Sequence, residues 1–394
     1  MVVVPDAITT EERTWDLGAP ALMSRRQRRD HNGPYRAAIP ASLANASDLN
    51  LTAETLAMAD DASAAIVRFD ADAAMILPFS ALLLRSESAA SSQIENLTAS
   101  ARAIAMAELD ASRSPNARII VANTRAMEAA IALADDLDGQ AILDTHAALL
   151  GDSAPDIVGA WRSQQVWNGG SRFGPHQADF VPPHHDRVAE AMADLVAFMH
   201  HDHFAVLAHV AIAHAQFETI HPFPDGNGRT GRALMHAMLR AKGLTNNITI
   251  PVSAGLLAET ESYFGALTAF REGDPNPIVA AVATASFVAI ENASTLSEEL
   301  TEIRTGWTTQ VSARADAAAW RVADLLLRLP VIDSPTVQHQ LDIPAPTALR
   351  AIEKLETANV LTETSGYARN RVWQAEQILL ALDGFAERAG RRAR

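Results

Sequence analysis

An apolar stretch without a turn signal occupies the middle of the chain. The segment AVLAHVAIAHAQFETI, residues 205–220, has apolar residues on every side of a helical projection and few charges. This pattern is typical of a buried central helix, and the stretch is too polar to cross a membrane. His209 and His214 fall on this helix, and we expect both to be core residues with hydrogen-bond partners rather than metal ligands.

Helical patterns continue on both sides of this segment. MHAMLRAKGL is expected to be a helix closed by Gly243, PVSAGLLAETESYFGALTAF to form further helices, and AETLAMADDASAAIVRF to form one near the N-terminus. Alanine is abundant and aromatic residues are few, which favours a mainly α protein of 394 residues with enough chain to bury a core. The sequence has no cysteine, so disulfides and thiolate metal sites are excluded.

The segment HPFPDGNGRTGR, residues 221–232, follows the central helix directly and has the composition of a phosphate-binding site. Gly226 and Gly228 flank Asn227, so the backbone can adopt positive φ and direct its N–H groups toward an anion at a helix start. Asp225 offers an oxygen ligand for Mg²⁺, and His221 can accept a proton near neutral pH.

The alternative is that Gly-Asn-Gly only joins two helices. A turn requires neither a histidine nor paired arginines, so the complete spacing HPFxDGNGRxxR favours the functional interpretation. Arg229 and Arg232 would supply fixed positive charge to phosphates. A neutral imidazole taking the proton of an attacking hydroxyl, with amides and guanidiniums around the phosphates, suits phosphoryl or nucleotidyl transfer.

This segment resembles the signature HPFx(D/E)GNGRxxR of the Fic family. The resemblance implies a Fic-type helical bundle that transfers AMP from ATP to a Ser, Thr or Tyr hydroxyl of a target protein, with His221 as the catalytic base. It further implies Asp225 as the Mg²⁺ ligand. The implied nucleotide-binding residues are Gly226, Asn227, Gly228, Arg229, Thr230, Gly231 and Arg232. The related Doc kinases have Ala-Asn-Lys in place of Gly-Asn-Gly, so the sequence favours nucleotidyl transfer.

A second motif precedes the signature. Ser91, Glu95 and Asn96 lie in a helical segment, SSQIEN, that resembles the inhibitory motif (S/T)xxxE(G/N) of the same family. Ser91 and Glu95 are four residues apart and would share one helix face. The resemblance implies that Glu95 pairs with Arg232 and occupies the place of the γ-phosphate, so that the enzyme is autoinhibited.

Two further segments are expected near the reaction. Residues 165–188, QVWNGGSRFGPHQADFVPPHHDRV, are punctuated by Gly and Pro and predict a β-hairpin flap. In the family such a flap pairs with an extended segment of the target protein. Tyr263 and Phe264 resemble residues that line the adenine and ribose end of the pocket, although a simple core pair is an equal alternative.

The tail from residue 316 carries ten basic and ten acidic side chains, so the whole net charge of −15 belongs to the preceding residues. Three helical segments from Trp320, Ser334 and Ala345, followed by two strands turning at Gly366, are typical of a winged helix. Arg350, Lys354, Arg369 and Arg371 give only a weak basic footprint. DNA binding therefore stays open, and protein docking or dimerisation is favoured.

We therefore expect a mainly α fold, a Fic-type helical bundle with a β-hairpin flap and a C-terminal winged helix, in four regions. These are a helical N-terminal region over 1–76, a Fic core over 77–290, a linker helix over 291–315 and a winged-helix domain over 316–394. No leader pattern or apolar run of membrane length is evident, so we expect a cytoplasmic protein without membrane association. A homodimer is implied by resemblance alone. Removal of AMP from a modified protein, or a nucleotide-sensing transcription regulator, are the alternative functions.

Overall fold

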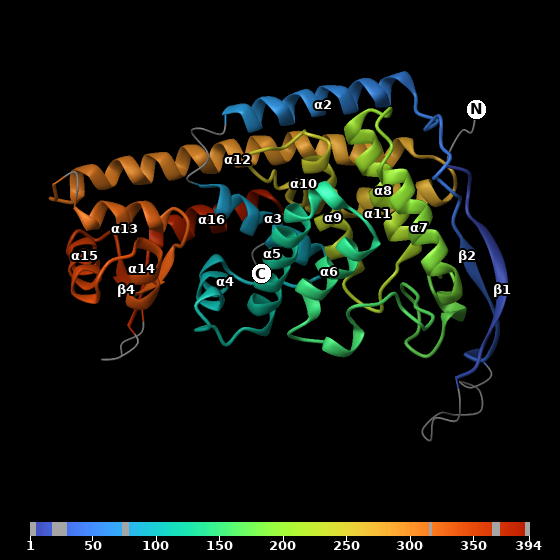
Figure 1. Cartoon of the computed structure of the whole chain (residues 1–394), viewed down its shortest axis with the longest axis horizontal. Coiled ribbons are helices and arrows are strands. Elements are labelled where there is room, and N and C mark those ends of the chain that lie inside the picture. The colour runs from blue at the N-terminus through green and yellow to red at the C-terminus, as the bar shows by residue number, and fades with distance from the viewer. Residues whose placement is uncertain (1–4, 18–29, 73–78, 315–316, 365–370, 391–394) are drawn as a thin grey trace. The chain divides into compact units, whose positions relative to one another are not determined.

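The computed structural model describes residues 5–17, 30–72, 79–314, 317–364 and 371–390 (Figure 1). Helices make up most of the described chain and the strands are few and short, so the expected mainly α fold is confirmed. Contacts within the chain group its residues into two units. Unit 1 comprises residues 1–63, 126–243 and 260–283, and unit 2 comprises residues 64–125, 244–259 and 284–394.

Unit 1 is organised around helix α8 (Val206–Ile220), which confirms the predicted central helix. Every residue of α8 after Val206 is buried. Three further helices pack against it or its partners: α7 (Val188–Met199), α9 (Asn227–Ala241) and α11 (Thr260–Arg271). Helix α6 (Gly139–Leu150) packs on α7 and α9. The residues that follow α8 are therefore attached to a helix that is packed on all sides.

Short 3-10 helices join these elements within the described part of unit 1: η3 (Ala134–Asp136), η4 (Pro155–Ile157), η5 (Pro175–Gln177) and η6 (His185–Arg187). Helix α9 runs on from the signature and is followed by Gly243 in the left-handed conformation, at φ 74°. This confirms the predicted helix and its end, because a glycine after the last turn adopts positive φ without a Cβ clash.

The N-terminal region contains a β-hairpin that the sequence did not predict. Strand β1 (Thr9–Trp15) pairs antiparallel with β2 (Gly33–Ile39), with Thr9 opposite Ile39 and Trp15 opposite Gly33. The region expected to be helical over 1–76 therefore also contains a β-hairpin, and the predicted helix is present as α2 (Ala53–Ala71). The hairpin packs on segments more than a hundred residues away, as described below, and no local pattern reveals such packing.

Helices α2, α5 (Pro115–Ala132) and α12 (Asn276–Gln310) each contribute residues to both units. Helix α12 is continuous across residue 290, so the expected linker helix over 291–315 is the second part of a longer helix rather than a separate element. The expectation that the chain has no apolar run of membrane length was also wrong. Among the described residues, α12 is long and apolar enough to cross a membrane, judged by length and composition alone. Half of the residues in this apolar stretch of α12 are buried.

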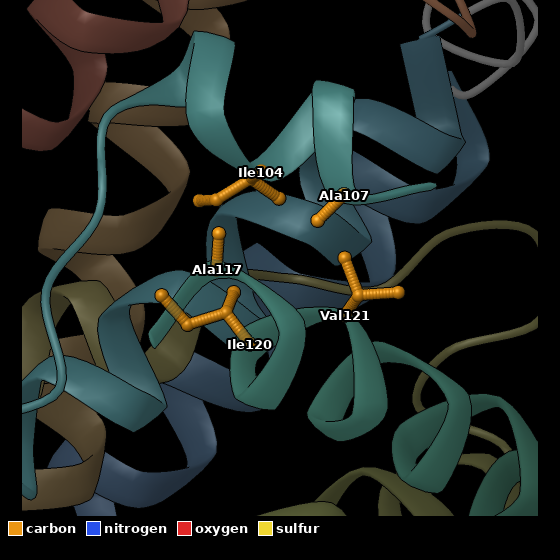
Figure 2. Close-up of a cluster of buried hydrophobic side chains, with 5 residues drawn as sticks. All are labelled: Ile104, Ala107, Ala117, Ile120 and Val121. Carbon is orange, nitrogen blue, oxygen red and sulfur yellow. The ribbon is translucent and has the colours of Figure 1, made fainter. Parts of the chain in front are cut away.

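Unit 2 contains helix α3 (Ser80–Ile94), which packs on α10 (Val252–Ala258) and on α16 (Glu376–Arg388). Helix α4 (Ala101–Glu108) packs against α5 through a small apolar cluster (Figure 2). In this cluster Ile104 and Ala107 of α4 meet three side chains of α5, namely Ala117, Ile120 and Val121. The expected Fic core over 77–290 thus divides, because α3 is grouped by its contacts with C-terminal elements.

The C-terminal part of unit 2 has helices where the sequence predicted them: α13 (Ala318–Leu326), α14 (Ser334–Leu341) and α15 (Ala345–Thr357). Strands β3 (Val331–Asp333), β5 (Val372–Gln374) and β4 (Thr362–Glu363) form an antiparallel sheet in that order. The predicted turn at Gly366 and Arg369 lie outside the described residues. Ala105 of α4 packs with Val331 and Val372, so the C-terminal sheet contacts α4. The winged-helix domain starting at residue 316 stays a prediction.

Candidate active site

His221 ends helix α8 in a conformation that few side chains adopt. Its φ of 52° and ψ of 62° lie in the left-handed region, and its N–H donates to the carbonyl of Phe217 over 2.9 Å. A residue other than glycine in this region costs free energy and persists only where its surroundings impose the conformation. The chain therefore leaves the buried helix at His221 itself, which is the expected catalytic base.

Arg162 is the side chain that sequence reasoning missed at this turn. Its Nε donates to the carbonyl of His221 over 2.8 Å, and its backbone N–H donates to the carbonyl of Pro222 over 2.9 Å. Only 3% of Arg162 is exposed, and burial lowers the pKa of its guanidinium to about 10. The group therefore keeps its charge near neutral pH and satisfies carbonyls that the end of α8 leaves open.

The loop after His221 is closed by Asn227. The carboxamide accepts a hydrogen bond from the N–H of Phe223 and donates one to its carbonyl, each over 2.8 Å. Between them Gly226 has φ 80°, as the sequence predicted, whereas Gly228 lies within helix α9. The expectation of positive φ on both sides of Asn227 was therefore half right. The side chain of Asn227 braces the loop, and backbone N–H groups at the start of α9 are the groups suited to an anion.

His146 supports this loop from α6 and was also missed. Its Nε2–H donates to the carbonyl of Asp225 over 3.0 Å, and its ring stacks on Phe223 at 3.7 Å between centroids. Burial lowers the pKa of His146, so the ring is neutral and packs as an aromatic group. A Cβ on Gly226 would stand 3.6 Å from this ring and 3.1 Å from Leu149. The loop is thus fitted closely against α6.

Helix α9 begins with the residues expected to hold phosphates. Arg229 and Arg232 are both buried, at 5% and 1% exposure, and Thr230 is fully buried. Gly231 allows α9 to approach α8, because a Cβ there would lie 2.8 Å from Oε1 of Glu218 and 2.9 Å from Cδ1 of Phe217. The signature therefore combines one glycine for backbone conformation, Gly226, with one for helix packing.

Asp225 is the expected Mg²⁺ ligand, and its side chain is 68% exposed. Its Oδ1 accepts the N–H of Gly226 over 2.7 Å and lies 3.6 Å from a guanidinium nitrogen of Arg229. Among the described residues no group of three or more His, Asp or Glu side chains could by itself hold a metal. An exposed carboxylate fits a cation that takes its other ligands from phosphates and water, as Mg²⁺ commonly does.

The predicted flap is present as two arms with little regular structure. Asn168 and Phe180 form an isolated antiparallel bridge, with hydrogen bonds of 2.9 and 3.3 Å. Within residues 165–188 of the described chain, this bridge is not extended into a strand, so the hairpin is shorter than expected. Glycine is required at position 170, because its φ is 69° and a Cβ there would collide with the carbonyl of Gln177.

The N-terminal hairpin supports the flap. The N–H of Ala38 in β2 donates to the carbonyl of Val181 over 3.0 Å, and the indole N–H of Trp15 donates to the carbonyl of Phe173 over 3.0 Å. On the other side the guanidinium of Arg271 stacks on the ring of Phe180 at 3.8 Å. The flap is therefore held by both strands of the β1–β2 hairpin and by α11, and neither partner was foreseen.

The structure separates the two aromatic residues that were considered for the adenine site. Tyr263 is 1% exposed, and its hydroxyl lies 2.8 Å from Nε2 of His214 in a buried hydrogen bond. Phe264 is 48% exposed. Burial lowers the pKa of His214 to about 3, so its ring is neutral. These contacts make Tyr263 a core residue that joins α11 to α8, whereas the exposure of Phe264 shows that the two residues are not a buried core pair.

The residues of the expected inhibitory motif lie at the end of α3 in unit 2. Ser91 is buried inside the helix, whereas Glu95 and Asn96 follow its last residue and are exposed. The N–H of Glu95 donates to the carbonyl of Ser92, and Asn96 has φ 62°. The sequence placed Ser91 and Glu95 on one helical face, but only Ser91 is within the helix. Their inhibitory role stays a prediction.

Comparisons with known proteins agree with this local structure. Residues 136–239 match the family model described as Fic/DOC family, and the chain therefore carries a Fic/DOC family domain. It is similar to protein adenylyltransferase fic-1 of Caenorhabditis elegans, with 30% identity over 161 residues that cover 40% of this chain and 28% of that protein. Protein adenylyltransferase Fic of Drosophila melanogaster is 32% identical over 151 residues, covering 38% of this chain and 28% of that protein.

The chain thus spans little more than a quarter of the length of these curated relatives. Among solved structures it is similar to a Fic family protein from Desulfovibrio desulfuricans G20. The TM-score is 0.52 and the identity 22%, over 83% of this chain and 97% of that one. This likeness concerns the fold, and it confirms the Fic-type helical architecture expected from the sequence.

Proposed function

We propose that this chain transfers AMP from ATP to a hydroxyl group of a target protein and releases pyrophosphate. The observation that carries the proposal is the loop from His221 to Arg232, in which the expected base directly precedes the N-terminus of a buried helix. The likeness of this region to proteins named protein adenylyltransferase supports the same reaction. Since that likeness covers only part of each relative, the activity is a proposal for this chain.

In the proposed reaction the hydroxyl oxygen of the target attacks the α-phosphorus of ATP. The bond from that phosphorus to the bridging oxygen of pyrophosphate breaks, and the hydroxyl proton passes to the imidazole of His221. The imidazole can take this proton because a histidine has its ordinary pKa close to neutrality. The left-handed turn and the Arg162 contact hold the backbone of His221 in one place, so the base is positioned before the substrate arrives.

The nucleotide phosphates would bind at the start of α9. The first N–H groups of a helix lack intrahelical partners and favour anions, and α9 has no side-chain cap at this end. Arg229 and Arg232 add positive charge, and their burial strengthens the interaction with phosphate oxygens. Asp225 would hold Mg²⁺, which when bound neutralises part of the phosphate charge.

We also propose that Glu95 inhibits the enzyme by pairing with Arg232 in place of the γ-phosphate. The position of Glu95 directly after α3 supports this, because a residue beyond the last helical turn can be displaced without unfolding the helix. Glu95→Gly should therefore raise target modification or self-modification, by about tenfold or more. Glu259→Gly is the matched control, because Glu259 is also exposed and directly follows a helix of the same unit, α10.

The decisive experiment incubates wild type, Glu95→Gly and His221→Ala with Mg²⁺ and a cell lysate. Parallel reactions receive ATP labelled at the α- or the γ-phosphate, and labelled proteins are identified by mass spectrometry. Transfer of the α label alone, lost in His221→Ala, is expected. Transfer of the γ label would indicate a kinase, and loss of label from pre-modified proteins would indicate removal of AMP. No labelled protein in any arm would contradict an enzymatic role.

For the C-terminal part we propose protein docking rather than DNA binding. Arg371, one of the basic residues that DNA binding would need, is held by Glu363 over 2.5 Å and lies 3.6 Å from Glu356. A guanidinium neutralised by two carboxylates is a poor phosphate ligand. DNA affinity measured at two salt concentrations tests this, because binding that weakens steeply with salt and is lost on Arg350→Ala would restore the transcription-regulator alternative.

A further inference from the structure

We propose that Arg162 is a positioning residue that fixes the catalytic turn at His221 and the two arms of the flap to one another. The inference rests on the proposed function, in which the flap holds the target segment and His221 takes its proton. It concerns a side chain that lies in neither the signature nor the flap. Its basis is a set of hydrogen bonds from one buried guanidinium to backbone carbonyls on both sides.

Toward the catalytic turn, Arg162 contacts three consecutive carbonyls. Its Nε donates to the carbonyl of His221 over 2.8 Å, and one terminal nitrogen donates to that of Ile220 over 3.4 Å. Its backbone N–H donates to the carbonyl of Pro222 over 2.9 Å. These bonds satisfy the end of α8 where the chain turns into the left-handed conformation, and they offset the cost of that conformation at His221.

Toward the flap, the same guanidinium reaches the base of both arms. One terminal nitrogen donates to the carbonyl of Gln164 over 2.9 Å, directly before the first arm, and the other donates to that of Pro183 in the second arm over 2.5 Å. Gln165 extends this link, since its amide nitrogen donates to the carbonyl of Pro182 over 2.9 Å. Tyr35 of β2 completes it by donating to the amide oxygen of Gln165 over 3.0 Å.

Only an arginine can make this set of contacts. Its donors form a planar fork that covers acceptors in several directions, whereas a lysine ammonium is a single point on a flexible stem. The partners given above are all uncharged, so the cation is not compensated by a carboxylate among these contacts, and burial accordingly lowers the pKa of Arg162. Burying a charge without a counter-ion costs free energy. The hydrogen bonds of the guanidinium to the carbonyls offset this cost and hold the carbonyls in place.

The consequence is that one side chain sets the distance between the target backbone and the base. Weakening the hydrogen bonds of Arg162 should displace both the flap, which holds the target segment, and His221. The Michaelis constant for the target should rise through the flap, and kcat should fall through His221. The affinity for ATP should stay within about twofold, because the phosphates bind at the start of α9, which Arg162 does not contact.

The test compares Arg162→Lys with Arg172→Lys by hydrogen exchange and mass spectrometry. Lysine keeps the charge, and Arg172 is a matched control because it lies on the flap with an exposed side chain stacked on Phe173. In Arg162→Lys we expect faster exchange in two separate segments, residues 165–183 and 221–226, by about tenfold. Exchange in α7 and in the buried part of α8 should not change. Faster exchange in only one of the two segments, in neither, or equally in α7 and α8 would overturn the proposal.

Steady-state kinetics provide the second readout. Arg162→Lys should raise KM for the target and lower kcat, each by about tenfold, with unchanged ATP affinity. Arg240→Lys, which changes an exposed arginine in the last turn of α9, should behave as wild type in kcat. A loss of kcat alone, in proportion to a loss of folded protein, would show a merely structural role. The exchange experiment needs no activity, so it still tests the positioning role if the wild type transfers no AMP, and the two failures are distinguishable.

Discussion

The carboxamide of Asn227 and the backbone of Phe223 are joined by a reciprocal pair of hydrogen bonds, each of 2.8 Å. The pair closes the loop that carries Asp225 and Gly226, and it lies in a buried place where unsatisfied groups are costly. The side chain of Asn227 therefore fixes the shape of the loop. In the proposed function, the backbone N–H groups at the start of α9 bind the phosphates.

Replacing Asn227 with Asp tests this arrangement. The aspartate can still accept the N–H of Phe223, but it repels the carbonyl that the amide had bonded. We expect the free energy of unfolding to fall by about 1–3 kcal/mol and ATP affinity to drop by at least about tenfold. Urea unfolding and calorimetric titration with ATP measure the two effects.

Asn116→Asp is the control for this change, because the side chain of Asn116 donates a solvent-exposed hydrogen bond to the carbonyl of Thr98. It should alter stability by less than about 0.5 kcal/mol. If Asn227→Asp kept wild-type ATP affinity, the loop would not need this brace to bind nucleotide.

Gly231→Ala should destabilise unit 1 by separating α9 from α8. The new Cβ would lie 2.8 Å from the carboxylate of Glu218 and 2.9 Å from the ring of Phe217, both on a helix that is enclosed on all sides. We expect a loss of about 1–3 kcal/mol in the free energy of unfolding. Thermal unfolding measures it.

Gly265→Ala provides the opposite expectation in the same unit. Gly265 lies within α11, and a Cβ there would meet no heavy atom within 4 Å. Because alanine favours a helix over glycine, this variant should be more stable by about 0.5–1 kcal/mol. Equal effects of the two substitutions would contradict the close packing at Gly231.

Parts of the fold that depend on local pattern could be predicted from the sequence. Helix α8 follows from its continuous apolar surface, and the turn at Gly226 follows from the only residue type that adopts positive φ without cost. Parts that depend on distant partners could not. Arg162 lies 59 residues from His221, and His146 lies 79 residues from Asp225. A lone arginine in a loop or a histidine in a helix carries no local sign of such a partner.

The β1–β2 hairpin shows the same limit in another form. Its strands are joined by a connection too long to display a tight turn, and what holds the hairpin is its contact with the flap, through Trp15 and Ala38. The boundary at residue 290 failed for a related reason. Helix α12 has no break there, because the helical pattern continues after the apolar part gives way to polar residues.

Tyr263→Phe should affect stability and leave nucleotide binding unchanged. The substitution removes the hydroxyl that is bonded to His214 and keeps the buried ring. We expect the free energy of unfolding to fall by about 1 kcal/mol, with an unaltered KM for ATP. Phe264→Ala is the companion variant, since its ring is exposed. A raised KM for ATP in Tyr263→Phe would return that residue to the nucleotide site.

His221→Gly and His221→Ala should differ in stability although both abolish transfer. At φ 52° an alanine keeps the conformational cost of the histidine, whereas a glycine removes it. We expect His221→Gly to be more stable than His221→Ala by about 1 kcal/mol. Chemical unfolding of the two variants measures the difference. Equal stabilities would show that the left-handed turn relaxes once the imidazole is absent.

The two buried histidines of α8 should make stability fall in weak acid. Burial lowers the pKa of His209 to about 4 and that of His214 to about 3, against an ordinary value of 6.5. Between pH 6.5 and 4 the unfolded chain therefore binds protons that the folded chain excludes. The free energy of unfolding should decrease as the pH falls through this window, by up to about 1.4 kcal/mol per pH unit for each histidine, and the two histidines contribute no slope above it.

His209→Gln isolates one of these contributions. Glutamine keeps an N–H that can donate to the carbonyl of Phe198, which His209 contacts over 2.9 Å, but it does not titrate. Urea unfolding at several values between pH 7 and 5 should give a slope reduced by about one proton in this variant. An unchanged slope in His209→Gln would mean that this ring is protonated in the folded protein, and the neutral core assigned to α8 would then be wrong.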